Sequence, residues 1–146
     1  MDELLVNKEV VYGVLSGRVS TAINRRLYRD FRTNELPVTP EQFIILLFLS
    51  SKDGITQQEL ANTTYKDKPS ITRLLDNLEK RSFIARLPDK TDKRSNLVYI
   101  TKTGMAINQK AKEIALETMK IALNGITEEE VKLGQLILKK IFKNLE

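Results

Sequence analysis

Apolar residues recur every four positions near the start of the chain, which is the spacing of one face of an α-helix. They run through the segment from Lys8 to Arg32 and draw a single slanted ridge. Pro37 follows a few residues later, where it restrains its neighbour and cannot donate a backbone hydrogen bond. The pattern therefore predicts a long helix that ends before this proline. Its ridge consists of Val11, Leu15, Val19, Ile23, Leu27 and Phe31.

Helix-capping residues mark the starts of the next three predicted helices. Thr39 and Gln42 have the spacing of a capping box, and the run Phe43–Leu49 after them indicates a helix buried on most sides. Thr56 repeats this signature at the start of a short helix, and Asp67 caps another helix after the turn YKDK. The last of these helices turns a set of apolar residues to one side: Ile71, Leu74, Leu75 and Leu78.

Two strand-like segments come next, and a charged tip joins them. Phe83–Leu87 and Leu97–Thr101 have the composition and alternation of half-buried strands. A hairpin that only turned the chain would more cheaply use Asn-Gly or Asp-Gly, yet this tip has no glycine. We therefore expect a hairpin whose tip contacts a partner. The charged residues of the tip are Asp89, Lys90, Asp92, Lys93 and Arg94.

The chain closes with two more amphipathic helices. One is predicted from near Thr103 to Leu123, and the other begins with a capping box at Thr127. Apolar faces at the two ends of the chain lie outside the predicted core, so we expect a homodimer through them; packing within one chain is the alternative. The predicted interface residues are Val11, Leu15, Val19, Leu136, Ile141 and Leu145.

The order of these elements is typical of a winged helix-turn-helix. A short helix, a tight turn, a second helix and a charged β-hairpin follow one another without interruption. The predicted fold is mainly α with a small β-hairpin, in which N- and C-terminal dimerisation helices flank the winged module. We expect one domain over 1–146, with the winged module at about 39–101 and dimerisation helices at about 1–36 and 103–146.

Composition narrows the classes of function. The 146 residues include no cysteine and no histidine, which excludes thiol catalysis and disulfides and disfavours most zinc and general-base chemistry. There is no glycine-rich phosphate loop, so we expect neither an enzyme nor a bound cofactor. No secretory signal is apparent, and no apolar run approaches the roughly 20 residues that cross a bilayer. We therefore expect a cytoplasmic protein without a membrane partner.

Charge and its position favour double-stranded DNA as the partner. The net charge is +5, and basic and short polar residues gather where the second helix of the pair begins, the end that favours phosphate. An arginine at a wing tip suits the narrow minor groove of A·T-rich DNA. The candidate contacts on this helix are Lys66, Lys68, Ser70, Thr72 and Arg73. Those on the wing are Lys90, Lys93 and Arg94, with Asp92 placed to hold the Arg94 guanidinium.

Other interpretations of these residues stay open. The charges can be an ordinary solvated surface, and Arg73 can be a surface helix partner of Asp76 or Asn77. A winged-helix module that binds protein without sequence-specific DNA binding is the alternative function. Salt distinguishes the two, because binding to DNA weakens steeply as counterions compete for the phosphates.

The motifs resemble those of the MarR family of bacterial transcription regulators. The similarity lies in TQQELA and in SITRLLDNLEKRSFIARLPDKTDKRSNLVYITKTG, and the order of the outer helices extends it over essentially the whole chain. Ser82 departs from the pattern, since members often have glycine before the first wing strand. The absence of cysteine argues against the peroxide-sensing branch.

This resemblance implies a homodimer whose two winged modules grip a pseudo-palindromic operator, most often as a repressor. It implies base or phosphate contacts from Ser70, Thr72 and Arg73, and a minor-groove contact from Arg94 oriented by Asp92. It also implies release from DNA by a small effector, often phenolic or anionic, that binds between the dimer helices and the winged module. No residue identifies that effector.

Overall fold

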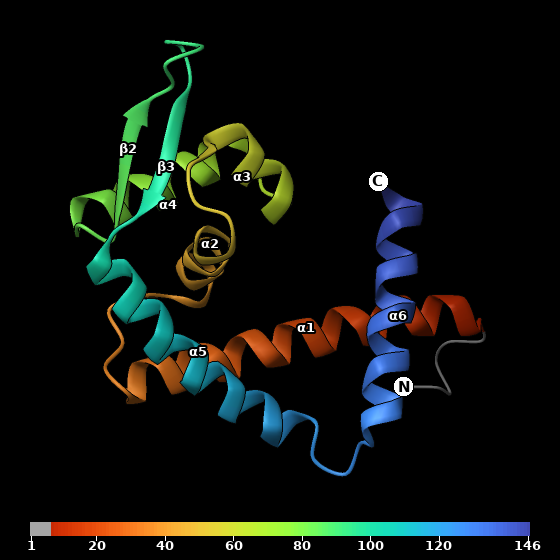
Figure 1. Cartoon of the computed structure of the whole chain (residues 1–146). Helices are drawn as coiled ribbons and strands as arrows, with labels where there is room; N and C mark the ends of the chain where they lie inside the picture. Colours follow the sequence, from red (N-terminus) through yellow and green to blue (C-terminus); the bar gives the residue numbers. More distant parts are fainter. Residues whose placement is uncertain (1–6) are drawn as a thin grey trace.

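The computed structural model describes residues 7–146, and its elements follow the predicted order (Figure 1). The mainly helical fold with a small sheet is confirmed. Residues 1–6 of the predicted segment 1–36 lie outside the described residues. None of the described helices is long and apolar enough to cross a membrane. The elements are α1 (Lys8–Thr33), α2 (Pro40–Ser51), β1 (Ile55–Thr56), α3 (Gln57–Thr64), α4 (Lys68–Lys80), β2 (Ile84–Pro88), β3 (Asn96–Ile100), α5 (Lys102–Ala122) and α6 (Glu128–Leu145).

Helix α2 lies in the middle of the winged module. Its capping box forms as expected: the Thr39 hydroxyl accepts from the backbone N–H of Gln42 at 3.2 Å, and the Gln42 side chain accepts from that of Thr39 at 3.0 Å. The buried residues of α2 join one apolar cluster that extends into α3, α4 and the sheet. This cluster fixes the position of the helix-turn-helix. Its fully buried members include Ile45, Leu46, Leu49, Leu60, Ile71, Leu75, Leu78 and Val98.

The sheet contains one strand that the sequence pattern did not predict. Its order is β1-β3-β2, all antiparallel, and β1 is only two residues long, with Ile55 opposite Val98. The hairpin strands each start and end one residue away from the predicted bounds. The shifts arise because Phe83 takes part in closing the end of α4 and Thr101 caps the start of α5.

Helix α4 is capped at both ends by its flanking residues. The Asp67 carboxylate accepts from the backbone N–H of Ser70 at 2.8 Å, and this hydrogen bond holds the pKa of Asp67 below its usual range. At the other end Ser82 has a left-handed φ of 62°. The N–H groups of Ser82 and its successor donate to carbonyls in the last turn of α4, as in a Schellman motif. The departure at Ser82 therefore keeps the turn that glycine would make and adds backbone strain.

The start of α5 is packed directly against the base of the wing. The Thr101 hydroxyl donates to the carbonyl of Ser82 at 2.6 Å and accepts from the N–H of Gly104. Gly104 is buried, and a Cβ added there would overlap the carbonyl oxygen of Phe83. Only glycine permits so close an approach between helix and sheet.

A polar contact ties α5 to α1. The buried Thr118 hydroxyl donates to Asp30 at 2.6 Å, and Arg26 Nε lies 3.0 and 3.1 Å from the two oxygens of the same carboxylate. The hydrogen bond from Thr118, together with Arg26, lowers the pKa of Asp30. The two long helices are therefore held together beside the winged module.

Candidate nucleic-acid interface

The first turns of α4 present the predicted polar residues on the surface of the winged module. Lys68 and Arg73 are exposed, whereas Ser70 and Thr72 are half-buried. The Thr72 hydroxyl donates to the carbonyl of Lys68 at 2.9 Å, so its oxygen is left to act as an acceptor. Arg73 has no ion pair with Asp76, which pairs with Arg86 instead.

Lys66 lies beside a carboxylate of α2. Its ammonium is 3.8 Å from Glu41, and its side chain is 28% exposed, the lowest value among the lysines with such a pair. A phosphate contact from Lys66 therefore competes with Glu41. The roles predicted for Lys66 and for the four residues of α4 stay predictions.

The tip of the wing is folded by its own carboxylates. Asp92 accepts from the backbone N–H of Arg94 at 3.1 Å and from the Ser95 hydroxyl at 3.4 Å. Asp89 accepts from the backbone N–H of Thr91, and that hydrogen bond lowers the pKa of Asp89. The expected hydrogen bond from the Arg94 guanidinium to Asp92 is replaced by one from its backbone. Asp92 thus shapes the turn, while Lys90, Lys93 and Arg94 are exposed.

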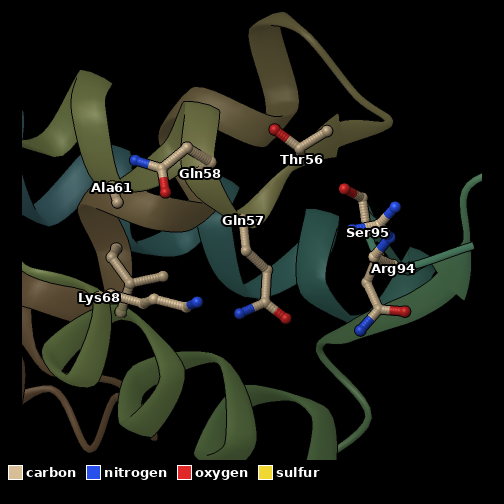
Figure 2. A pocket seen from close by; sticks show the side chains of 9 residues that line it. Thr56, Gln57, Gln58, Ala61, Lys68, Arg94 and Ser95 are labelled. Atoms are coloured by element: carbon tan, nitrogen blue, oxygen red, sulfur yellow. The ribbon is translucent and has the colours of Figure 1, made fainter. Parts of the chain in front are cut away.

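A cavity of about 320 Å³ lies between α3, α4 and the wing. Figure 2 shows Gln57 and Lys68 pointing into it, with Arg94 and Ser95 on the side of the wing. Two residues predicted from different segments, Lys68 and Arg94, therefore line the same cavity. Sequence reasoning missed Gln57, because only the fold turns the start of α3 toward the wing. The lining carries amide, ammonium and guanidinium donors, which suits an anionic or base-edge partner.

Arg86, at the base of the wing, is a residue for which the sequence left a solvated surface role open. It is half-buried and contacts α4 and α3 through Glu79, Asp76 and Gln57. Within residues 7–146, no group of three or more acidic side chains is placed to hold a metal ion.

The predicted dimerisation residues lie on faces that the chain itself leaves largely uncovered. All of α6 is described, and none of its residues is buried. Leu136 is 49% exposed and Leu145 is 72% exposed, and on α1 the values for Leu15 and Val19 are 45% and 55%. Val11 and Ile141 are intermediate. Large apolar residues at this exposure on two helices favour a partner surface over solvent.

Comparison with known sequences shows to which family of winged helix-turn-helix proteins this chain belongs. The sequence profile of the MarR family matches residues 38–96. The multiple antibiotic resistance protein MarR of Escherichia coli strain K12 is 31% identical over 130 residues, which span 86% of this chain and 89% of that protein. The chain belongs to the MarR family. Its similarity to the transcriptional regulator PecS of Dickeya dadantii, 29% identical, extends over 98% of the chain and 86% of PecS.

Structural comparison agrees with membership of the MarR family. A crystal structure of a mutant MarR from E. coli complexed with operator DNA matches with a TM-score of 0.83 and 29% identity. The match covers 94% of this chain and 97% of that one. MarR family members are transcriptional regulators, and the alternative of a winged-helix module that binds only protein is not favoured.

Proposed function

We propose that this MarR family regulator is a homodimeric repressor that binds a pseudo-palindromic operator in the cytoplasm. The start of α4 enters the major groove, and the wing reaches the adjacent minor groove. One winged module makes few contacts, so two modules about one helical turn apart are needed for specific binding. The similar E. coli MarR, solved with operator DNA, supports this role.

The cavity shared by α3, α4 and the wing is the observation that carries the proposal. It places Lys68 from the groove helix and Arg94 from the wing on one concave, donor-rich surface. A surface that joins a helix N-terminus to a basic hairpin fits a duplex, which presents base edges and phosphates side by side.

We propose that a small phenolic or anionic effector releases the dimer from DNA. A second cavity, of about 480 Å³, supports this step, since it lies where α1 meets the winged module. Tyr28 and Arg32 of α1 line one side of it, and Arg81 lies at the other. Arg81 Nε is buried without a hydrogen-bond partner among the described residues, and burial lowers the pKa of this guanidinium. An aromatic carboxylate offers both a ring and an acceptor for such a site.

Selection of binding sites from random duplexes tests the DNA-binding role. We expect the purified protein to enrich a pseudo-palindrome with half-sites about 10 base pairs apart, centre to centre. Arg94→Ala should weaken binding by about 1–3 kcal/mol, most strongly on A·T-rich flanks. A plot of the logarithm of the binding constant against the logarithm of the salt concentration should have a negative slope of about 0.9 for each phosphate contact.

Lys139→Ala, which removes one exposed charge from α6, is the matched control and should leave the flank preference unchanged. Equal losses for Arg94→Ala on every flank would reduce Arg94 to a phosphate contact. Binding that shows no salt dependence would contradict a DNA-binding role.

A further inference from the structure

We propose that Arg86 is a positioning residue that fixes the wing against the recognition helix α4. It would thereby set where Arg94 meets the minor groove, without contacting DNA itself. This inference rests on the proposed DNA-binding function and adds a determinant of how the wing is aimed. It is carried by a cluster of hydrogen bonds between the base of the wing and two other helices.

The Arg86 guanidinium is a branched link between three elements. Its Nε and one terminal nitrogen donate to the two oxygens of Glu79 at 3.2 and 2.9 Å, a side-on bidentate pair. The same terminal nitrogen donates to Asp76 at 2.6 Å, and the other donates to Gln57 of α3 at 3.3 Å. The backbone N–H of Arg86 also donates to Glu79, at 3.1 Å. Both the strand and its side chain are therefore bound to α4.

The burial of this link makes it stiff. The Arg86 side chain is 17% exposed, although the carboxylates around it are 40% and 58% exposed. Hydrogen bonds with Glu79 raise the pKa of Arg86, and those with Arg86 lower the pKa of Glu79. Both groups therefore stay charged together over the physiological range. A planar guanidinium with several partners is more restrained than a surface lysine pair.

The place of Arg86 in the hairpin explains why one link has this effect. In the antiparallel register it lies opposite Val98, which is fully buried and which also pairs with β1. Beyond this level Leu87 and Pro88 are exposed, and the wing projects away from the body of the module (Figure 1). β1 thus holds one edge of the wing base through β3, and Arg86 holds the other edge through α4.

A double-mutant cycle between Arg86 and Arg94 tests the proposal on the selected operator. If Arg86 aims the wing, Arg86→Gln removes most of what Arg94 contributes. We expect Arg94→Ala to weaken the wild type about tenfold or more on A·T-rich flanks, but less than about twofold in the Arg86→Gln background. The half-site bases preferred by α4 should not change, because α4 keeps its place in the core.

Two further variants separate positioning from general damage. Glu79→Gln leaves Arg86 in place but removes its bidentate partner, and it should also reduce the effect of Arg94→Ala. Arg25→Gln removes the same charge from an exposed position of α1, and in this background Arg94→Ala should weaken DNA binding as much as it does in the wild type. Melting temperatures identify variants that fail to fold. If Arg86→Gln is one of these, the double-mutant cycle of Glu79→Gln with Arg94→Ala tests the proposal instead.

Additive losses in the cycle would overturn the proposal, since Arg94 would then act independently of Arg86. A changed half-site preference in Arg86→Gln would also overturn it, because Arg86 would then act through α4 itself. Failure of the wild type to select any DNA site is a different result and would contradict the proposed function.

Discussion

Three residues without the freedom of glycine occupy left-handed backbone at helix ends. Glu35, Tyr65 and Ser82 have φ values of 55°, 56° and 62°. In each case the N–H groups that follow the helix donate back to carbonyls of its last turn. A left-handed conformation raises the energy of a non-glycine residue by about 1–2 kcal/mol. Within residues 7–146 the backbone therefore carries local strain at three such turns, and two of them flank α4.

Ser82→Gly should stabilise the protein. Glycine relieves the left-handed strain, part of which is offset by the greater entropy of glycine in the unfolded chain, so we expect a gain of about 0.5–1 kcal/mol. The nearby hydrogen bond from Thr101 uses the backbone carbonyl of Ser82 and survives the change. Urea unfolding measures the difference, with Ser82→Ala as the control that keeps the strain. Equal stability of the glycine and alanine variants would contradict this account.

Residue-scale prediction was good where a side chain acts on its own neighbours and poor where it acts across the fold. The caps at Thr39, Asp67 and Thr127 need only local spacing, and all three form. At the wing tip Asp92 accepts from the backbone N–H of Arg94 and from the Ser95 hydroxyl, in place of the expected guanidinium pairing. The ion pairs of Arg86 were not predicted, since its carboxylate partners lie seven and ten residues away, a spacing that suggests no pairing in sequence.

At the scale of elements, the amphipathic helices were predictable and the small strand β1 was not. Helical apolar spacing and caps set the bounds of α1, α2, α5 and α6 to within about two residues. β1 is too short to show alternation, and it is a strand only because β3 lies beside it. Helix α6 has the opposite property: its pattern is strong, yet its own chain leaves it exposed.

Charges on the exposed face of α6 should therefore disrupt assembly. The double substitution Leu136→Glu and Ile141→Glu places two carboxylates on the face that we assign to the dimer, and we expect a monomeric or poorly folded protein. Light scattering with circular dichroism distinguishes these outcomes from a folded dimer. The control pair, Gln135→Glu and Lys139→Glu, adds glutamates at exposed polar positions of the same helix. An intact dimer in the first variant would rule out this face as the interface.

At the scale of the whole molecule, the joint between α1 and the winged module lies between the faces that we propose for dimerisation and for DNA binding. Gln42 of α2 donates to Asn77 of α4 at 3.0 Å and accepts from Arg81 at 2.9 Å. Arg81 also donates to the carbonyl of Pro37 in the linker after α1 and lies over the ring of Phe83. A ligand in the adjoining cavity would therefore contact groups that set the angle between α1 and α4.

We expect a small aromatic carboxylate such as 4-hydroxybenzoate to bind at this joint and to weaken DNA binding. Calorimetry would measure its affinity for the free protein, and fluorescence anisotropy of a labelled operator would measure release. Tyr28→Ala and Arg32→Gln should abolish both effects, whereas Arg25→Gln, outside this cavity on the same helix, should preserve them. Release that persists in Tyr28→Ala and Arg32→Gln would place the effector elsewhere.

The close packing at Gly104 has a mechanical consequence for the proposed dimer. Because the first turn of α5 touches the wing base with no room for a methyl group, we expect helix and hairpin to rotate together as one rigid body. A helix of 21 residues is about 32 Å long, so a sideways shift of about 3 Å at its distant end corresponds to a rotation of about 5°. Such a rotation moves a wing tip some 20 Å from the pivot by about 2 Å, enough to break a hydrogen bond. In the proposed homodimer, the tolerated distance between half-sites would then be determined at the subunit interface.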